Sequence, residues 1–246
     1  MKGPPKIIVL DTPELLANRA ASGFAARARS AVQARGEFTV ALSGGSTPAA
    51  LYGLLASPRF CGYILWPSVR VFWGDERCVP PDDADSNFAA ADRALLSRVP
   101  LPNANVHRMK GELEPRLGAL DYREQLRAHF GESTTRFDLV LLGLGPDGHT
   151  ASLFPHTQAL EVVDSTCVAN HVRTAPVAPW RLTLTYPAIN AARAVWFLVE
   201  GEGKAQIAAE VLDGPENVLA LPAQGVRPSD GELLWMLDRA AARLLK

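Results

Sequence analysis

The sequence predicts one α/β domain, residues 1–246, in which the short strands of a doubly wound sheet alternate with helices. A chain of 246 residues, of which 48% are hydrophobic, is long enough to bury one large core. Short apolar runs repeatedly precede segments with helical periodicity, which is the alternation expected of a parallel sheet. Three of these runs end directly in glycine and polar side chains, where a doubly wound sheet binds its ligand.

The N-terminal part predicts a strand followed by a long helix. Ile7–Leu10 is a short apolar run that we expect to be a buried strand. Asp11, Thr12 and Pro13 supply an N-cap and a first-turn proline for the helix, which runs to about Arg35. Gly36 then ends the helix.

The next strand, Phe38–Leu42, leads into a loop of small and hydroxyl-bearing residues. This loop consists of Ser43, Gly44, Gly45, Ser46 and Thr47. Adjacent glycines let the backbone approach a ligand, and the helix predicted at 49–55 presents unpaired N–H groups, so the loop predicts a phosphate-binding site. The alternative is a capped helix start that needs no ligand, with Ser46 or Thr47 as the cap before Pro48.

Polar side chains also follow the third strand, Val69–Trp73. They are Asp75, Glu76 and Arg77, after Gly74. Such a group is either a solvated turn with a surface ion pair or part of a ligand site. Because the carboxyl ends of parallel strands share one edge of a sheet, we expect 75–77, 43–47 and 143–149 to converge on one crevice.

The segment after the third strand predicts a small helical insertion. It begins like a calcium loop, but Phe88 stands where an EF-hand requires glycine, which excludes that site. Ser86 or Asn87 instead caps a helix, 88–96. A second, polar helix is expected at about 114–129, and these two helices interrupt the alternation of strands and helices.

The strongest candidate for chemistry is the stretch 137–155. The apolar run Leu139–Leu142 is followed by the pattern G-x-G-x-x-G and then by His149. This pattern also occurs in dinucleotide sites, but these need a long helix after the glycines, and Pro155 follows Gly148 too closely for one. A tight turn with positive φ angles is a further alternative. The polar residues beyond the glycines favour an active-site loop with His149 as its reactive group.

The rest of the chain continues the alternation. Strands are expected at 167–172, 180–185, 195–199 and 233–237, and helices at 186–192, 205–212 and 238–245. The strand at 180–185 alternates polar and apolar residues, so we expect it to be half-buried. Lys204 stands at the head of a helix, where the dipole disfavours a cation. It is therefore either an exposed solubilising lysine or a group that meets a bound anion.

Composition excludes several classes of protein. The formal charge of −1, with acids and bases intermixed, gives no reason to expect nucleic acid or an anionic membrane as partner. The three cysteines form no Cys/His cluster, so we expect neither a disulfide framework nor a zinc site. No apolar stretch approaches the roughly 20 residues of a membrane-spanning helix, and the first apolar run is too short for a secretory signal. We therefore expect a cytoplasmic protein.

Several segments occur in a distinctive order along the chain. They are 43–48 (SGGSTP), 74–80 (GDERCVP) with 85–87 (DSN), 143–155 (GLGPDGHTASLFP), 181–185 (RLTLT) and 222–226 (PAQGV). In this order they resemble the motifs of the 6-phosphogluconolactonases, which are related to glucosamine-6-phosphate isomerase/deaminase. The resemblance implies a Rossmann-like, mostly parallel sheet flanked by helices, hydrolysis of 6-phosphogluconolactone in the oxidative pentose phosphate pathway, and no metal or organic cofactor.

The resemblance also implies roles for individual residues. His149 is expected to be the general base that activates water, which suits a side chain that exchanges protons near neutral pH. Asp75 is expected to orient the substrate or bind a hydroxyl, and Arg77 or glycine-loop N–H groups to stabilise the carbonyl oxygen. The residues expected to hold the substrate phosphate are Ser43, Gly44, Gly45, Ser46, Thr47, Arg77, Arg181 and Lys204.

Two rival functions share parts of this pattern. An isomerase/deaminase of amino-sugar phosphates would have the same fold, but the residues after His149 read Thr-Ala-Ser-Leu-Phe-Pro rather than the Asn-Glu-Pro ending of those enzymes. A sugar-phosphate sensor would carry a DNA-binding segment or a basic tail, and the sequence has neither. Tyr186 departs from the family pattern, and this departure affects only what the resemblance implies about one wall of the pocket. We expect a monomer.

Overall fold

The protein is built on a parallel sheet, and the computed structural model describes residues 5–132, 134–173 and 177–246. Six described strands form this sheet in the order β1-β9-β8-β5-β2-β3. They are β1 (Lys6–Leu10), β2 (Phe38–Leu42), β3 (Val69–Trp73), β5 (Leu139–Leu142), β8 (Ala194–Val199) and β9 (Glu232–Asp238). All neighbouring pairs run parallel, which confirms the predicted sheet.

A second, smaller sheet is antiparallel. Its strands lie in the order β4-β7-β6 and are β4 (Asp75–Arg77), β7 (Trp180–Leu184) and β6 (Cys167–His171). Only Gly74 separates β4 from β3. The chain therefore passes from the large sheet directly into the small one at the carboxyl end of β3.

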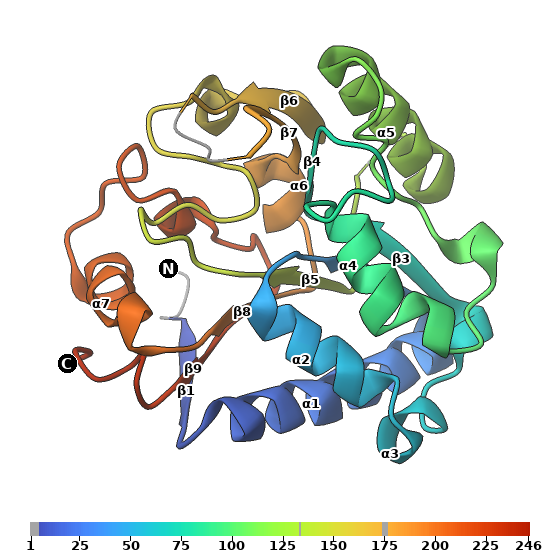
Figure 1. The fold of residues 1–246 in the computed structure, drawn as a ribbon, viewed down its shortest axis with the longest axis horizontal. Helices are drawn as coiled ribbons and strands as arrows, with labels where there is room; N and C mark the ends of the chain where they lie inside the picture. The colour runs from blue at the N-terminus through green and yellow to red at the C-terminus, as the bar shows by residue number, and fades with distance from the viewer. Residues whose placement is uncertain (1–4, 133, 174–176) are drawn as a thin grey trace.

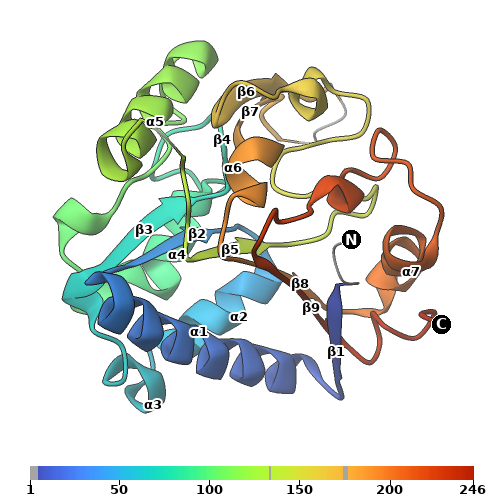
Figure 2. The same ribbon diagram turned by 180° about the vertical axis from the view of Figure 1, so that it is seen from behind.

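Helices cover the large sheet on both sides. They are α1 (Pro13–Arg35), α2 (Ser46–Leu55), α3 (Pro58–Cys61), α4 (Asn87–Ala94), α5 (Pro115–Phe130), α6 (Tyr186–Asn190) and α7 (Ala205–Asp213). In Figures 1 and 2, α1 and α2 lie together on one side of the sheet, and α6 and the small sheet lie on the other. The predicted helical insertion corresponds to α4 and α5, of which α4 packs against α2, and α5 against β6 and β7.

The first helix illustrates how local sequence sets an element. Thr12 Oγ1 accepts a hydrogen bond from the N–H of Leu15 at 3.3 Å, Pro13 follows in the first turn, and Gly36 closes the helix with a φ of 83°. Its buried face is rich in alanine, so the helix packs closely on the sheet. The predicted bounds and caps of this helix are confirmed.

The order of the strands places a crevice between β2 and β5. From β2 the chain moves outward to the edge strand β3, and it then returns to the other side of β2 to form β5, β8 and β9. Val40 pairs with Leu139 across this junction. The position between β2 and β5, where the direction of strand addition reverses, is the switch point of the sheet. Loops on its two sides diverge and leave room for a ligand at the carboxyl ends of the strands.

Three local predictions are wrong. The strand β1 is not buried, because it forms an edge of the sheet, and Val9 is 50% exposed. The strand β7 is not half-buried, because α5 packs against it and the N–H of Ser152 contacts Thr183 Oγ1, so that Arg181 and Thr183 are both buried. Residues 238–245 form turns rather than a helix, because Asp238 ends β9 and its carboxylate accepts hydrogen bonds from the N–H groups of Gly201 and Ala241.

Candidate active site

The loops that follow β2, β3 and β5 meet in a cleft with a volume of about 660 Å³. Every site residue expected from the sequence lines it. These residues are Ser43, Gly44, Gly45, Ser46, Thr47, Asp75, Arg77, His149, Arg181 and Lys204. The cleft lies at the switch point between β2 and β5, so the fold accounts for the convergence of segments far apart in the chain.

The Ser43–Thr47 loop leads into α2 without a side-chain cap. Gly45, with a φ of 104°, is the N-cap residue, and no described side chain caps the helix. Ser46 and Thr47 occupy the first helical positions, so the interpretation of this loop as a start capped by one of them is wrong. The first N–H groups of α2 and its positive dipole end therefore face the cleft without a protein cap, as in anion-binding loops.

Ser43 adds an unpaired hydroxyl to the same loop. Tyr52 fixes its backbone, because the Tyr52 hydroxyl donates to the Ser43 carbonyl at 2.7 Å and accepts from its N–H at 3.1 Å. Ser43 Oγ is buried and has no partner among the described residues. A buried hydroxyl without a partner costs free energy, and a ligand oxygen in the cleft would supply the missing hydrogen bond.

Two arginines that line the cleft give it positive charge. Arg77 on β4 and Arg181 on β7 are direct partners across the small sheet. Arg77 Nη1 donates to the Asp85 carbonyl at 2.5 Å, and Arg181 Nη2 to the Val177 carbonyl at 2.6 Å. Arg181 Nη1 is buried and has no partner among the described residues. Burial lowers the pKa of Arg181, and the charge of Arg77 lowers it further, so both arginines gain from a bound anion.

Asp75 is held in place by two donors. Ser152 Oγ donates to Asp75 Oδ2 at 2.6 Å, and Asn87 Nδ2 lies 3.3 Å from Asp75 Oδ1. The residue is only 8% exposed. A carboxylate fixed in this way presents its remaining acceptor sites to the cleft, where sugar hydroxyl groups can donate to them.

Glu76 points away from the cleft. Neighbouring residues on a strand face opposite sides, so Asp75 and Arg77 line the cleft while Glu76 is buried against the start of α4. Its carboxylate accepts hydrogen bonds from the N–H groups of Arg77, Asn87 and Phe88 and from the Ser86 hydroxyl. Burial raises its pKa. The interpretation of these residues as a solvated turn is therefore wrong.

The loop after β5 holds His149 in a defined orientation. Asp147 Oδ1 lies 2.5 Å from His149 Nδ1, and the ring of Phe154 stacks on the imidazole at 3.9 Å between centroids. A Cβ atom on Gly145 would lie 2.0 Å from His149 Nδ1, so this position requires glycine. Burial is the largest single effect on Asp147 and would raise its pKa, but the hydrogen bonds and the charge of His149, together with the backbone hydrogen bond of Asp147 itself, add up to a lowered pKa. The His149 side chain is 24% exposed and lines the cleft.

The glycines of this loop do not start a helix. Gly148 has a φ of 78°, and the fully described chain between β5 and β6 contains a single 3₁₀ turn, Gln158–Glu161, instead of a crossover helix. A dinucleotide site lacks its helix N-terminus here. The glycines provide a tight turn and space for the imidazole.

Lys204 also lines the cleft. It ends the 3₁₀ turn Glu202–Lys204 and directly precedes α7. None of the described carboxylates forms an ion pair with its Nζ. Burial lowers the pKa of Lys204, and the charge of Asp147 partly opposes that effect. An incoming anion would compensate the buried charge.

Other residues of the cleft escaped the sequence analysis. They are Asn87, Asp147, Ser152, Phe154 and Glu200. Glu200 directly follows β8, so the rule of polar residues at strand ends would have found it. Tyr186, by contrast, does not line this cleft, because its hydroxyl donates to the Pro222 carbonyl at 2.7 Å.

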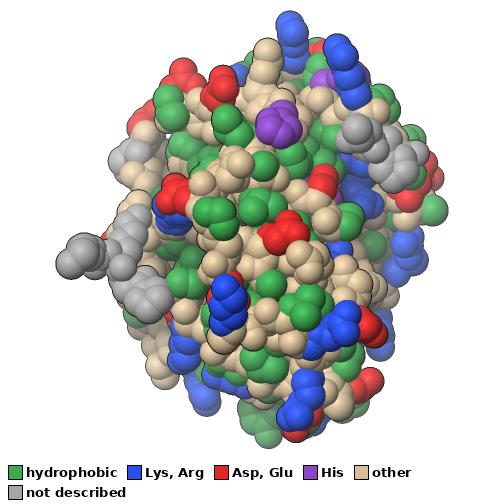
Figure 3. Space-filling view, turned by 90° about the vertical axis from the view of Figure 1, so that its left-hand side faces the viewer, with side chains coloured by type: hydrophobic (Ala, Val, Ile, Leu, Met, Phe, Trp, Pro, Cys, Tyr) green, Lys and Arg blue, Asp and Glu red, His purple; other side chains and the backbone are tan. Residues whose placement is uncertain are grey.

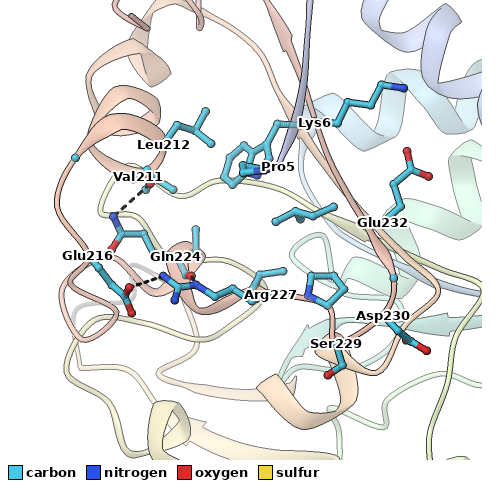
Figure 4. A pocket seen from close by; sticks show the side chains of 17 residues that line it. Pro5, Lys6, Val211, Leu212, Glu216, Gln224, Arg227, Ser229, Asp230 and Glu232 are labelled. Atoms are coloured by element: carbon cyan, nitrogen blue, oxygen red, sulfur yellow. Dashed lines mark hydrogen bonds and ion pairs between the residues drawn. The ribbon is translucent and has the colours of Figure 1, made fainter. Parts of the chain in front are cut away.

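A second cavity, of about 910 Å³, lies near the amino ends of β1 and β9. Figure 4 shows two of the interactions within it: Arg227 forms an ion pair with Glu216, at 3.0 Å, and Gln224 Nε2 donates to the Val211 carbonyl, at 3.2 Å. None of the site residues expected from the sequence lines it. The site residues expected from the sequence lie in the smaller cleft instead.

The surface, the side-chain clusters and the helices of the described residues add three observations. On the face that carries α7, acidic, basic and apolar side chains are interspersed (Figure 3). Among the described residues, no cluster of three or more His, Cys, Asp or Glu side chains could hold a metal ion. In that same part of the chain, the helices are too short or too polar to cross a membrane.

Comparisons with known proteins agree with the fold and the motifs. The family model of glucosamine-6-phosphate isomerases/6-phosphogluconolactonase matches residues 11–235. The 6-phosphogluconolactonase of Nostoc sp. is 43% identical over 86% of each chain, and that of Synechocystis sp. is 41% identical over 98% of this chain and 99% of its own. The solved structure of 6-phosphogluconolactonase from Trypanosoma brucei is 28% identical, with a TM-score of 0.87 over 100% of both chains.

Proposed function

Because this chain belongs to the glucosamine-6-phosphate isomerase/6-phosphogluconolactonase family, we propose that it hydrolyses 6-phosphogluconolactone to 6-phosphogluconate. One observation carries the proposal: a histidine held by a carboxylate lies in the same cleft as two arginines, a lysine and an uncapped helix N-terminus. A lactone phosphate needs both a base for water and a cationic region for phosphate.

His149 is the general base in this proposal. Asp147 accepts from Nδ1–H and so leaves Nε2 unprotonated and able to take a proton from water. The resulting hydroxide oxygen attacks the lactone carbonyl, and a tetrahedral oxyanion forms. When this intermediate collapses, the bond between the carbonyl carbon and the ring oxygen breaks, and the imidazolium returns its proton to the leaving alkoxide.

The reaction also requires groups that stabilise the negative charge that develops on the carbonyl oxygen. N–H groups of the glycine loop or Arg77 stabilise the oxyanion. Asp75 accepts from a substrate hydroxyl and fixes the sugar relative to His149. In this arrangement the residues that touch the reacting part of the substrate are His149, Asp75 and Arg77.

The phosphate is held by the Ser43–Thr47 loop together with Arg77, Arg181 and Lys204. The unpaired atoms Ser43 Oγ and Arg181 Nη1 support this assignment, because a phosphate oxygen would supply the partner that each lacks. We further take the enzyme to work as a cytoplasmic monomer, without a nucleic acid or membrane partner.

A side-by-side assay of the purified protein tests the proposed function. It measures turnover of 6-phosphogluconolactone and of glucosamine 6-phosphate, with correction for spontaneous opening of the lactone. We expect hydrolysis of the lactone and no conversion of the amino sugar. Turnover of the amino sugar alone would assign the chain to the isomerase/deaminase branch of its family instead.

A further inference from the structure

Asn87 lies at the junction of two parts of the cleft and has no role in the proposed mechanism. It is the first residue of α4 and is 3% exposed. Its Nδ2 donates to the backbone carbonyl of Asp75 at 2.9 Å and lies 3.3 Å from Asp75 Oδ1. One amide group thus contacts both the strand and the carboxylate of Asp75.

The same amide packs against the Ser43–Thr47 loop. A Cβ atom on Gly44 would lie 1.9 Å from Asn87 Oδ1 and 2.6 Å from Asn87 Cγ. The φ angle of Gly44 is not positive, so its backbone conformation does not require glycine. The close approach of Asn87 therefore leaves no room for a side chain at this position.

The backbone of Asn87 is held independently of its side chain. Its N–H donates to Glu76 Oε1 at 2.7 Å, and Ser86 Oγ caps the helix by accepting from Ala89 N–H at 3.1 Å. Truncation of the Asn87 side chain therefore leaves the start of α4 in place. Any change in kinetics after this truncation is therefore due to the lost contacts of the Asn87 amide with Gly44 and Asp75.

We propose that Asn87 is a positioning residue that fixes the Ser43–Thr47 loop relative to the Asp75 carboxylate. This inference rests on the proposed function, in which the loop binds the phosphate and Asp75 orients the sugar. The two ends of one rigid substrate must then meet both groups at once. Small displacements between binding groups lower rates strongly, so a shared amide contact sets the distance that the substrate spans.

Asn87→Ala tests the positioning role against a purely structural one. We expect kcat for 6-phosphogluconolactone to fall about tenfold, the size of effect of one lost buried hydrogen bond, and KM to rise. For a gluconolactone without phosphate, kcat falls but KM does not change. The matched control Ser86→Ala removes the neighbouring cap and lowers the melting temperature, but leaves kcat and KM within about twofold of wild type.

A second pair of variants tests the contact itself. Gly44→Ala introduces the Cβ atom that overlaps the Asn87 amide, so we expect KM for the phosphorylated lactone to rise. Gly44→Ala combined with Asn87→Ala frees that space, and we expect its KM to be lower than that of Gly44→Ala alone. If Asn87→Ala does not fold, Asn87→Asp keeps the shape but replaces the donor to Asp75, and kcat falls.

Two results would overturn the proposal. One is kinetics of Asn87→Ala that match those of Ser86→Ala, and the other is a double variant no better than Gly44→Ala. In both experiments, kcat and KM of each variant are expressed relative to the wild type, and the substrate is whichever of the two sugar phosphates the wild type converts. Wild-type turnover itself is the separate test of the proposed function.

Discussion

At the scale of single residues, the cleft combines paired and unpaired polar groups. Asp147 and Asp75 each have defined partners, which fixes their orientation before substrate arrives. Ser43 Oγ and Arg181 Nη1 are buried without partners among the described residues. In the proposed mechanism, the groups with partners orient the substrate and the general base, and the groups without partners bind the substrate phosphate.

His149→Ala is the direct test of the general base. If Nε2 takes the proton from water, the variant should lower kcat by about 10² to 10⁴, the usual contribution of general base catalysis. KM should change little, because the phosphate contacts remain. Rates are compared with the wild type by lactone assay, and circular dichroism checks that the variant is folded. Near-normal activity in the folded variant would remove His149 from this role.

Lys204→Ala tests the phosphate contact. Loss of a charge-assisted hydrogen bond should raise KM for 6-phosphogluconolactone by about 10-fold to 100-fold, with a smaller effect on kcat. A gluconolactone without phosphate has no group for Lys204 to bind, so its KM should stay unchanged. An equal effect on both lactones would place Lys204 elsewhere in the mechanism.

The lowered pKa of Lys204 predicts a pH dependence of binding. Because burial lowers this pKa, the free enzyme loses the ammonium proton at a lower pH than an exposed lysine does. Affinity for the stable product 6-phosphogluconate should therefore weaken as the pH rises toward that pKa. Calorimetric titration of wild type and Lys204→Ala measures this, and a parallel pH dependence in both would contradict the assignment.

At the scale of elements, the short strand β4 organises one wall of the cleft. Asp75 and Arg77 line the cleft while Glu76 faces α4, and the Glu76 carboxylate accepts four hydrogen bonds there. A buried carboxylate at a helix N-terminus is stabilised by the helix dipole. The strand and the helix therefore form one unit, and Glu76 joins them.

Glu76→Gln should destabilise this unit. The glutamine NH₂ group would face two donors that the carboxylate oxygen now accepts from, so we expect the free energy of unfolding to fall by about 2 to 4 kcal/mol. Denaturant titration of wild type and variant measures the difference. A variant as stable as the wild type at neutral pH would show that these hydrogen bonds contribute little.

The free energy of unfolding should also depend differently on pH in the wild type and in Glu76→Gln. Since burial raises the pKa of Glu76, the folded protein retains this proton at a pH where the unfolded chain has lost it. The unfolded state then binds fewer protons, so this group makes the free energy of unfolding fall as pH rises from the ordinary glutamate pKa through the raised value. Glu76→Gln lacks this titration, so the advantage of the wild type should be larger at the acidic end of that window.

Sequence patterns predicted the elements well where local chemistry is strong. Thr12, Pro13 and Gly36 mark the ends of α1 unambiguously, because caps act within a few residues. The strand β4 was missed, since three charged or polar residues resemble a turn and only the partner strand β7 makes them extended. The role of Asn87 depends on Gly44 and Asp75, which no local pattern joins to it.

At the scale of the whole molecule, the two ends of the parallel sheet have different tasks. The carboxyl ends of β2, β5 and β8 carry the loops of the cleft. At the opposite end, Asp138 directly precedes β5 and is 4% exposed. It accepts from the N–H and hydroxyl of Thr39 and pairs with Arg35 at 2.7 Å, so it joins β2, β5 and α1.

Asp138→Ala should therefore reduce stability without changing the chemistry. The substitution removes the buried carboxylate, so Thr39 and Arg35 lose their partner. Since Arg35 is 37% exposed and its charge is partly screened, we expect the free energy of unfolding to fall by about 2 to 4 kcal/mol. The conservative control Asp138→Asn keeps an acceptor for Thr39 and should lose less. Because the cleft lies at the other end of the sheet, kcat and KM per folded molecule should stay within about twofold of wild type for both variants. A folded Asp138→Ala protein with strongly lowered kcat would show that the amino end of the sheet also positions the reacting groups.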